Sequence, residues 1–200
     1  MKLYYLKGAC SLATMISLIE SGQAFESSAV DRATKRASDG KDLNKINPKG
    51  YVPALVLDSG EVLSENVAVL AYVASLDKSG KLGPAPGTEG CYRLLEWLAY
   101  INSEVHKNFS PLFRGNIPEE TRVVFKENLA RRLGYIEQRL GDKPFLMGDN
   151  FSVADAYLFV VLGWRSRVGV DISSLPKLSA FFERVSTRPS VHQAHQIEGL

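Results

Sequence analysis

The sequence predicts an α/β domain built on a mixed four-stranded sheet, followed by an all-α domain. Short apolar runs of strand length occur only in the first part of the chain, whereas helical periodicity alone follows residue 88. Between the two patterns, residues 78–87 (KSGKLGPAPG) are so rich in Gly and Pro that no regular element can run through them. We therefore expect a first domain at 1–77, a linker at 78–87 and an all-helical domain at 88–200.

The first domain opens with a β-α-β pattern. Residues 2–6 (KLYYL) form the short aromatic and apolar run of a buried strand. A helix is expected at 10–20, because apolar residues recur there at helical spacing and Gly22 is placed to end it. Residues 26–31 (ESSAVD) then form a weaker second strand.

A β-β-α pattern completes this domain. Residues 54–57 (ALVL) are expected as the third strand, and Asp58-Ser-Gly60 suits a tight hairpin turn. Residues 61–64 would return as an antiparallel fourth strand, and a helix with one apolar stripe follows at 65–76. The combined order gives a four-stranded mixed sheet.

The second domain is expected to be entirely helical. Helical periodicity predicts segments at 89–112, 119–140, 153–167 and 175–187. Ser152 and Asp155 form a capping-box pattern ahead of the third segment. We assign this pair to folding rather than catalysis, so Asp155→Ala should cost about 1 kcal/mol of stability and leave the chemistry intact.

Composition excludes several classes of protein. With 45% hydrophobic and 23% charged residues, the chain of 200 residues matches an ordinary globular protein. Lys and Arg (24) exceed Asp and Glu (22) by only two, so no large positive charge draws nucleic acid or an anionic membrane. No apolar run approaches the roughly 20 residues that span a bilayer, and the N-terminus lacks a signal-peptide pattern.

Cysteine usage indicates a reducing compartment. Cys10 and Cys91 are the two cysteines, and neither belongs to a C-x-x-C pair. This argues against a disulfide scaffold and a cysteine-based zinc site. We expect a cytoplasmic protein without a metal, whose partners are small molecules or other proteins.

Cys10 is the first candidate for chemistry. It lies where the first strand meets the first helix, and free backbone N–H groups and the helix dipole at that point favour an anion and lower a thiol pKa. The alternative is that Cys10 is an inert packing residue.

Val52-Pro53 lies directly before the third strand. A cis peptide bond would suit a sharp entry to the strand, while an ordinary trans turn is the alternative. A cysteine after strand one and a proline entering strand three, in this topology, make a thioredoxin-like arrangement. In such a domain the backbone beside the proline can pair with a bound peptide.

A third feature is Ser64-Glu65-Asn66 at the start of the helix after the hairpin. The helix N-terminus attracts a carboxylate, and Glu65 can pair with an ammonium group. The alternative is that Ser64 and Glu65 only cap the helix.

Five segments, spread in order over nearly the whole chain, resemble bacterial beta-class glutathione transferases. They are G-A-C-S-L at 8–12, N-P-K-G-Y-V-P at 47–53, S-E-N-V-A at 64–68, S-E-V-H-K at 103–107 and F-S-V-A-D-A-Y-L-F at 151–159.

The resemblance implies a cytosolic homodimer that binds glutathione in the first domain and an electrophile against helices of the second. Cys10 would contact the glutathione thiol and could hold it as a mixed disulfide. The resemblance further implies a glutathione site made of Tyr5, Cys10, Ser11, Lys35, Val52, Pro53, Glu65, Asn66, Ser103, Glu104, His106 and Lys107.

Within this set the resemblance implies different roles. Val52 would pair through its backbone, Glu65 and the residue after it would hold the γ-glutamyl end, and Lys35 would lie near the glycine end. Residues 103–107 would border the site, partly across the dimer. His106 is expected to act with Cys10, since a neutral imidazole can accept a proton or orient a substrate; a surface or packing role is the alternative.

The chain departs from the family pattern at several positions. Thr14-Met15 stand where Pro-His is common, and Asn66 stands where Gly or Ser is common. Ala99 replaces an Asn and cannot hydrogen-bond through its side chain, so we exclude it from the site. Tyr4 and Tyr5 point to opposite faces of a strand, and the family favours Tyr5 in a supporting role.

Three functions follow from these features. The first is conjugation of the glutathione thiolate to small electrophiles. The second is glutathione-dependent reduction of disulfides or peroxides through a Cys10 mixed disulfide, which glutathione would resolve because no neighbouring cysteine is available. The third is a non-catalytic protein of the same fold that binds ligands or partners.

Overall fold

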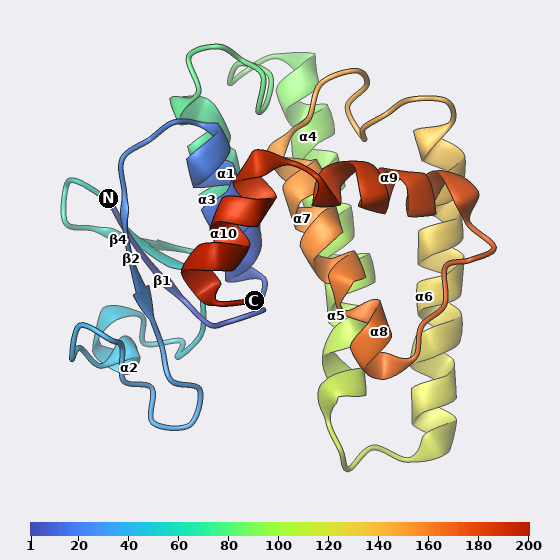
Figure 1. The fold of residues 1–200 in the computed structure, drawn as a ribbon, viewed down its shortest axis with the longest axis horizontal. Coiled ribbons are helices and arrows are strands. Elements are labelled where there is room, and N and C mark those ends of the chain that lie inside the picture. Colours follow the sequence, from blue (N-terminus) through green and yellow to red (C-terminus); the bar gives the residue numbers. More distant parts are fainter.

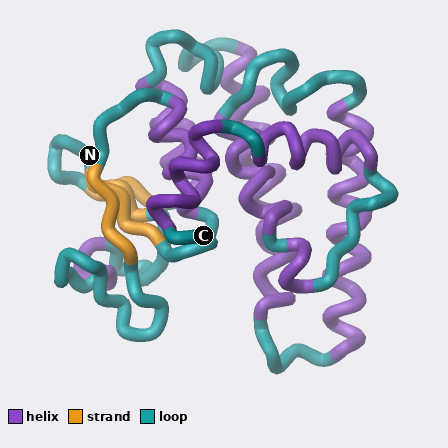
Figure 2. The backbone as a smooth tube through the Cα atoms, viewed as in Figure 1, coloured by secondary structure: helices purple, strands orange, loops and turns teal.

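The computed structural model describes residues 1–200 and places a small sheet beside a larger set of helices (Figures 1 and 2). The strands are β1 (Lys2–Tyr5), β2 (Glu26–Ala29), β3 (Ala54–Val56) and β4 (Val62–Ser64). Their order in the sheet is β2-β1-β3-β4; β1 and β2 run parallel, and the other two pairs are antiparallel. The predicted mixed four-stranded sheet is confirmed.

Helices cover both faces of this sheet. On one face lie α1 (Ser11–Glu20) and α3 (Asn66–Leu76), which pack against each other and against the sheet. On the other face, Leu43 of the short helix α2 (Leu43–Ile46) joins Tyr4, Val52 and Ala54 in a small buried cluster. Tyr5 belongs to the main core instead, so the predicted opposite orientation of Tyr4 and Tyr5 is confirmed.

The second half of the chain is helical, as expected, but its segments are more divided than the periodicity predicts. The expected helix at 89–112 consists of α4 (Glu89–Tyr100), a π-helix η1 (Ile101–His106), α5 (Lys107–Phe109) and a 3₁₀ turn η2 (Ser110–Phe113). The expected helix at 153–167 breaks into α7 (Val153–Gly163) and α8 (Arg165–Val168), while α6 (Glu119–Leu140) and α9 (Pro176–Ser186) lie close to their predicted bounds.

One helix was not expected from the sequence. It is α10 (Pro189–Glu198), which returns to the first half of the molecule and packs against α1 (Figure 1). Pro189 stands in its first turn, and the left-handed Gly199 follows its last residue. Proline in the first turn and glycine after the last residue are typical start and stop signals of a helix.

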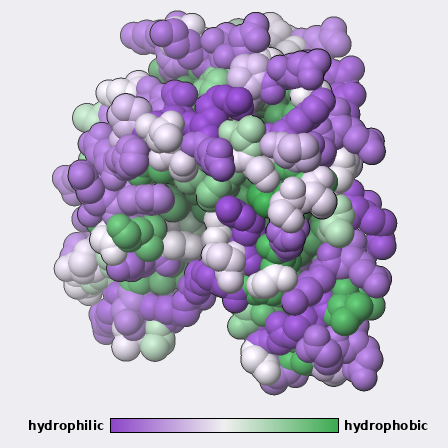
Figure 3. Space-filling model, turned by 45° about the vertical axis from the view of Figure 1, so that its right-hand side comes forward, coloured by the Kyte–Doolittle hydropathy of each residue, from purple (hydrophilic) through white to green (hydrophobic).

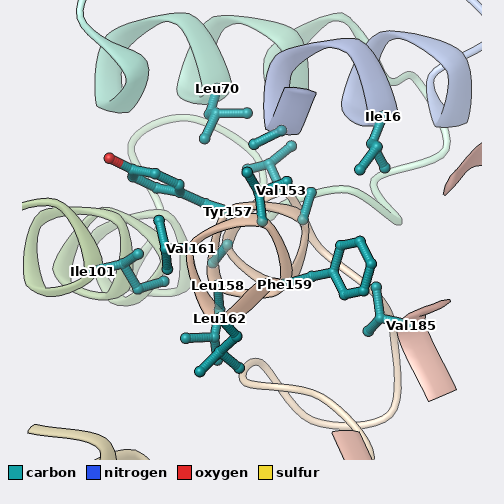
Figure 4. Close-up of a cluster of buried hydrophobic side chains, with 14 of the residues drawn as sticks. Ile16, Leu70, Ile101, Val153, Tyr157, Leu158, Phe159, Val161, Leu162 and Val185 are labelled. Atoms are coloured by element: carbon teal, nitrogen blue, oxygen red, sulfur yellow. The ribbon is translucent and has the colours of Figure 1, made fainter. Parts of the chain in front are cut away.

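A single hydrophobic cluster of 43 buried residues runs from Leu3 to Ala194, through both halves of the chain. Its centre is α7, of which residues 153–162 are all buried (Figure 4). Helix α7 packs against α1, α3 and α4. Helix α1 also contacts the sheet, α3 and α10, so it is covered by elements from both halves of the chain. None of the helices combines the length and the apolar character needed to span a bilayer.

Candidate active site

Two adjoining cavities lie around the N-terminus of α1, on a molecule that is hollowed between two lobes (Figure 3). The smaller, of about 270 Å³, is lined by residues of the loops at the strand ends and by residues of α3, η1 and α7. The larger, of about 570 Å³, is lined by residues of η2, α8 and the loop before α1. Both cavities are lined by four common residues, Ala9, Cys10, Arg32 and His106. The thiol and the imidazole predicted from the sequence therefore stand on the border between the two cavities.

Cys10 occupies the N-cap position of α1, and its Sγ donates to the Val52 carbonyl oxygen at 3.5 Å. The Val52–Pro53 peptide bond is cis. Burial raises the pKa of the Cys10 thiol to about 12, although the backbone N–H groups of Cys10 and Ser11 act in the opposite direction. The expectation of a lowered pKa at the helix start is therefore wrong, because desolvation of the thiolate outweighs the helix terminus.

Glu65 lies at the wall of the smaller cavity in an uncommon backbone conformation. Its φ of 71° is in the region that residues with a side chain rarely adopt, and functional sites often retain such residues. Its Oε1 accepts from Lys49 Nζ and from the Tyr51 hydroxyl, both at 2.6 Å. These two donors lower the pKa of Glu65, so the wall carries a fixed carboxylate beside the start of α3.

Two of the departures from the family pattern contact each other. The Thr14 hydroxyl donates to Asn66 Oδ1 at 3.1 Å, and Asn66 Nδ2 donates to the Cys10 carbonyl oxygen at 3.3 Å. Thr14 is fully buried and Asn66 is 5% exposed. The two residues thus tie the start of α3 to the residue that carries the reactive thiol.

Because Thr14 and Asn66 share one buried hydrogen bond, we expect their substitutions to be coupled. Thr14→Val and Asn66→Ala should each lower the free energy of unfolding, and the double variant should lose about 1 kcal/mol less than the sum of the two. Urea unfolding of the four proteins measures this difference. As a control, Asn66→Ala is combined with Ser17→Ala, whose losses of stability should add, because Ser17 donates only to Ala13 of its own helix. Additive losses for Thr14→Val and Asn66→Ala would contradict the coupling.

His106 is held by Tyr157, which projects from the buried helix α7. The Tyr157 hydroxyl donates to Asn102 Oδ1 at 3.0 Å and lies 2.7 Å from His106 Nδ1. Since that hydroxyl has one proton, its oxygen accepts from Nδ1–H, and Nε2 is the ring nitrogen left as an acceptor. Burial, with a smaller contribution from Lys107, lowers the pKa of His106 to about 4, so the ring is neutral at physiological pH.

In the loop before Cys10, both backbone groups of Gly8 are hydrogen-bonded to side chains of the second half of the chain. The Gly8 N–H donates to Glu198 Oε2 at 2.7 Å, and the Trp164 indole N–H donates to the Gly8 carbonyl oxygen at 3.0 Å. Glu198 is buried, its Oε1 has no hydrogen-bond partner, and burial raises its pKa to about 7. The C-terminal helix therefore positions the reactive loop through a buried carboxyl group that is only partly satisfied.

We expect Glu198→Gln to stabilise the protein in a pH-dependent manner. The folded-state pKa of about 7 lies above the ordinary 4.5, so wild type loses stability as pH rises from 4.5 to 7. Gln keeps an acceptor for Gly8 but carries no charge. The free energy of unfolding of the variant should therefore exceed that of wild type by about 1–3 kcal/mol at pH 8 and by little at pH 4.5.

Urea unfolding at both pH values measures this difference. The matched control is Glu183→Gln, since Glu183 is exposed on α9. A Glu198→Gln variant that is less stable than wild type at pH 8 would show that the ionised carboxylate is needed by the loop.

The structure gathers seven of the residues expected from the sequence around the smaller cavity. These are Cys10, Val52, Pro53, Glu65, Asn66, His106 and Lys107. Lys107 and Glu65 also act on the Cys10 thiol, lowering and raising its pKa respectively, although both contributions are smaller than that of burial.

Five other expected residues do not line either cavity. The Tyr5 hydroxyl donates to the Ile197 carbonyl oxygen, and the fully buried Ser11 exchanges hydrogen bonds with Leu6. Lys35 donates to the Gly50 carbonyl oxygen, 3.2 Å away. The remaining two are Ser103, which donates to Ala99, and Glu104, which pairs with Arg132 at 2.7 Å.

Several residues at the site were not identified from the sequence. Lys49 and Tyr51 belong to the N-P-K-G-Y-V-P segment, and their contact with Glu65 depends on how the hairpin packs. Asn102 and Tyr157 are 55 residues apart in the chain and meet only in the fold. The π-helical turn at 101–106 had no sequence signal, although such turns are frequent at functional sites.

Comparison with known proteins agrees with this arrangement. Residues 8–76 match the family described as Glutathione S-transferase, N-terminal domain, and residues 94–189 match Glutathione S-transferase, C-terminal domain. The chain is 42% identical to Glutathione S-transferase GstA of Escherichia coli O157:H7, with 100% of both chains covered.

Solved structures agree as well. A bacterial glutathione transferase, BphK, superposes with a TM-score of 0.97 at 46% identity, and the beta-class enzyme of Sphingomonas chungbukensis with 0.94 at 46% identity; each match covers 100% of both chains. The resemblance drawn from the sequence is thereby confirmed. The chain belongs to the glutathione S-transferase family and, within it, to the bacterial beta class.

Proposed function

We propose that the chain binds glutathione in the smaller cavity and transfers its sulfur to an electrophile held in the larger one. The observation that carries this proposal is the shared border of the two cavities, where Cys10 and His106 stand. A thiolate placed at that border reaches both a tripeptide on one side and a small molecule on the other. Closeness and orientation of this kind lower the barrier for a bimolecular reaction.

The smaller cavity offers complementary groups for glutathione. The N-terminus of α3 supplies N–H groups and a positive dipole end for the γ-glutamyl carboxylate, and Glu65 supplies a carboxylate for the ammonium group. Val52, before cis-Pro53, supplies backbone groups for the peptide part. In this proposal, glutathione is the co-substrate and no step uses a metal.

When glutathione binds, the Cys10 thiol turns its one proton from the Val52 carbonyl oxygen to the glutathione thiolate and so acts as a hydrogen-bond donor to it. Its pKa of about 12 keeps it protonated at neutral pH, and a neutral thiol beside an anionic sulfur stabilises that anion. The same pKa disfavours the redox reaction, because a thiol that stays protonated is a poor nucleophile toward disulfides or peroxides. Neutral His106 is placed to accept a proton or orient the electrophile through Nε2.

Further parts of the proposal concern the assembly. The enzyme works as a homodimer in the cytoplasm, and Ser103 and Glu104 of each protomer contribute at the interface. Support comes from the family and from the position of Ser103 and Glu104 on η1, outside the cavity of their own chain. Analytical ultracentrifugation tests the dimer.

The test of conjugation uses 1-chloro-2,4-dinitrobenzene with glutathione. Wild type should be retained on immobilised glutathione and should release chloride, and Cys10→Ser should keep most of the rate because it keeps a donor. Cys10→Ala should raise the apparent pKa of the bound glutathione thiol in the pH–rate profile by about one unit, since hydrogen bonds to charged groups contribute about 1.5–3 kcal/mol. Cys91→Ser is the matched control.

Two results would contradict the proposal. Retention on glutathione without conjugation or disulfide reduction would identify a non-catalytic binding protein. Reduction of a mixed disulfide that disappears in both Cys10 variants, without conjugation in wild type, would identify a reductase.

A further inference from the structure

The larger cavity has a strongly positive wall. Its ten lining residues include Arg32, Arg114 and Arg167 and no Asp or Glu. None of these three guanidinium groups forms an ion pair with a carboxylate of the chain. The wall therefore holds three positive charges that the protein itself does not neutralise, in a chain whose formal net charge is only +2.

These arginines come from three separate parts of the chain. Arg32 follows β2, Arg114 directly follows η2, and Arg167 belongs to α8. The guanidinium carbon of Arg167 lies 5.2 Å from the centroid of the Phe113 ring, and one of its nitrogens lies beside Gly8. Contact with an aromatic face holds a guanidinium group in place without using its capacity to bind an anion.

Aromatic rings form another part of the same cavity. The Trp164 ring stands edge-to-face with Phe113 at a centroid distance of 5.6 Å and with His106 at 4.8 Å. All three rings line the cavity. A planar aromatic ligand finds here the edge and face contacts that aromatic pairs prefer.

We propose that the preferred electrophiles are aromatic compounds that carry a carboxylate or sulfonate group. This inference rests on the proposed function, whose larger cavity it assigns to a substrate class. The ring would pack against Trp164 and Phe113, and the anionic group would face Arg114 and Arg167. In the reaction, the glutathione sulfur forms a bond to the ring carbon that bears a halogen, and the halide leaves with the bonding pair; the carboxylate stays unchanged.

Arg32 needs separate treatment, because it lines the smaller cavity as well. Its charge can serve a carboxylate of glutathione as readily as one of the electrophile. Arg114 and Arg167 line only the larger cavity of the two. The experiment therefore uses these two residues.

The test compares 4-chloro-3,5-dinitrobenzoate with 4-chloro-3,5-dinitrobenzamide, which share ring, leaving group and shape but differ in charge. Each rate is divided by the uncatalysed rate with glutathione, so the intrinsic reactivity cancels. Wild type should favour the benzoate about tenfold in kcat/KM, mainly through KM, because each of two partly exposed charge pairs should improve its binding about threefold. Added salt should reduce this preference.

Variants assign the preference to the arginines. Arg114→Gln and Arg167→Gln should each lower the ratio of benzoate to benzamide about threefold, and the double variant should bring it close to one. The matched control is Arg131→Gln, an arginine on the exposed side of α6 whose partner is Asn128 of the same helix; it should leave the ratio at the wild-type value.

The outcomes separate this inference from the proposed function. If neither compound is conjugated and 1-chloro-2,4-dinitrobenzene is not conjugated either, the proposed function fails; if only 1-chloro-2,4-dinitrobenzene is conjugated, the substrate class is wrong. If both are conjugated but the benzamide is equally good, or the two variants lower both substrates by the same factor, only the substrate class is wrong. If the loss of activity in the Arg114 and Arg167 variants came entirely from a higher KM for glutathione, these arginines would be assigned to glutathione instead.

Discussion

Replacing Asp155 by Ala is expected to lower the free energy of unfolding by about 3 kcal/mol, more than a cap alone would cost. Asp155 is fully buried, and its carboxylate accepts from the Ser152 N–H, the Ser152 hydroxyl and the Leu146 N–H at 2.6–2.8 Å. Ala leaves two buried backbone donors without a partner, at about 1–3 kcal/mol each. Urea unfolding and thermal melting at pH 5 measure the loss, and Tm should fall by roughly 6–12 °C. At pH 8, above the raised Asp155 pKa of about 6, burial of the ionised carboxylate lowers the stability of wild type, so the loss should be smaller there.

The control for this prediction is Asp149→Ala, because Asp149 is an exposed aspartate six residues earlier. Its substitution should change stability by less than about 0.5 kcal/mol. At temperatures where the Asp155 variant is folded, it should conjugate glutathione at the wild-type rate, since Asp155 does not line either cavity at the site. A variant of normal stability that loses turnover would contradict the structural role.

The second large effect concerns the reactivity of Cys10. Burial moves the thiol pKa from 9.0 to about 12, which lowers the thiolate fraction at neutral pH about a thousandfold. The thiolate of a weaker acid is also a better nucleophile, so the rate constant of the Cys10 thiolate should be about twenty times higher than that of a free cysteine thiolate. Iodoacetamide should therefore alkylate Cys10 about fifty times more slowly than a free cysteine at pH 7.5, and the rate should rise about tenfold per pH unit between pH 7 and 9.

Mass spectrometry of the alkylated protein follows this reaction, with Cys91→Ser as the background so that Cys10 is the only cysteine. Cys10→Ser in the same background supplies the blank. Addition of urea should abolish the protection. A rate that reaches its plateau below pH 8 would show that the helix N-terminus lowers the thiol pKa after all.

The sequence predicted those parts of the fold that depend on local pattern. Short apolar runs and a hairpin turn placed β1, β3 and β4, and the helical period placed α6 and α9, because these signals lie within the residues of each element. The division of α4 from η1 was not predicted, because the residues of η1 contact Tyr157, 51 to 55 positions later in the chain, and no local pattern reveals such a contact.

At the site too, the sequence located residues but could not predict properties that depend on packing. Segment resemblance located Cys10, Val52, Glu65 and His106, all of which line the smaller cavity. The state of Cys10 could not be derived locally, since a helix N-terminus and burial act on the thiol in opposite directions and only packing decides which is larger.

The packing of α1 has a consequence for how the protein unfolds. This helix belongs to the first half of the chain, yet α7 and α10 from the second half cover it, and residues 11–18 are all buried. Separation of the halves would expose a helix that is apolar along most of its length. The two halves should therefore melt in one cooperative transition, and glutathione should raise the midpoint of that single transition rather than resolve two.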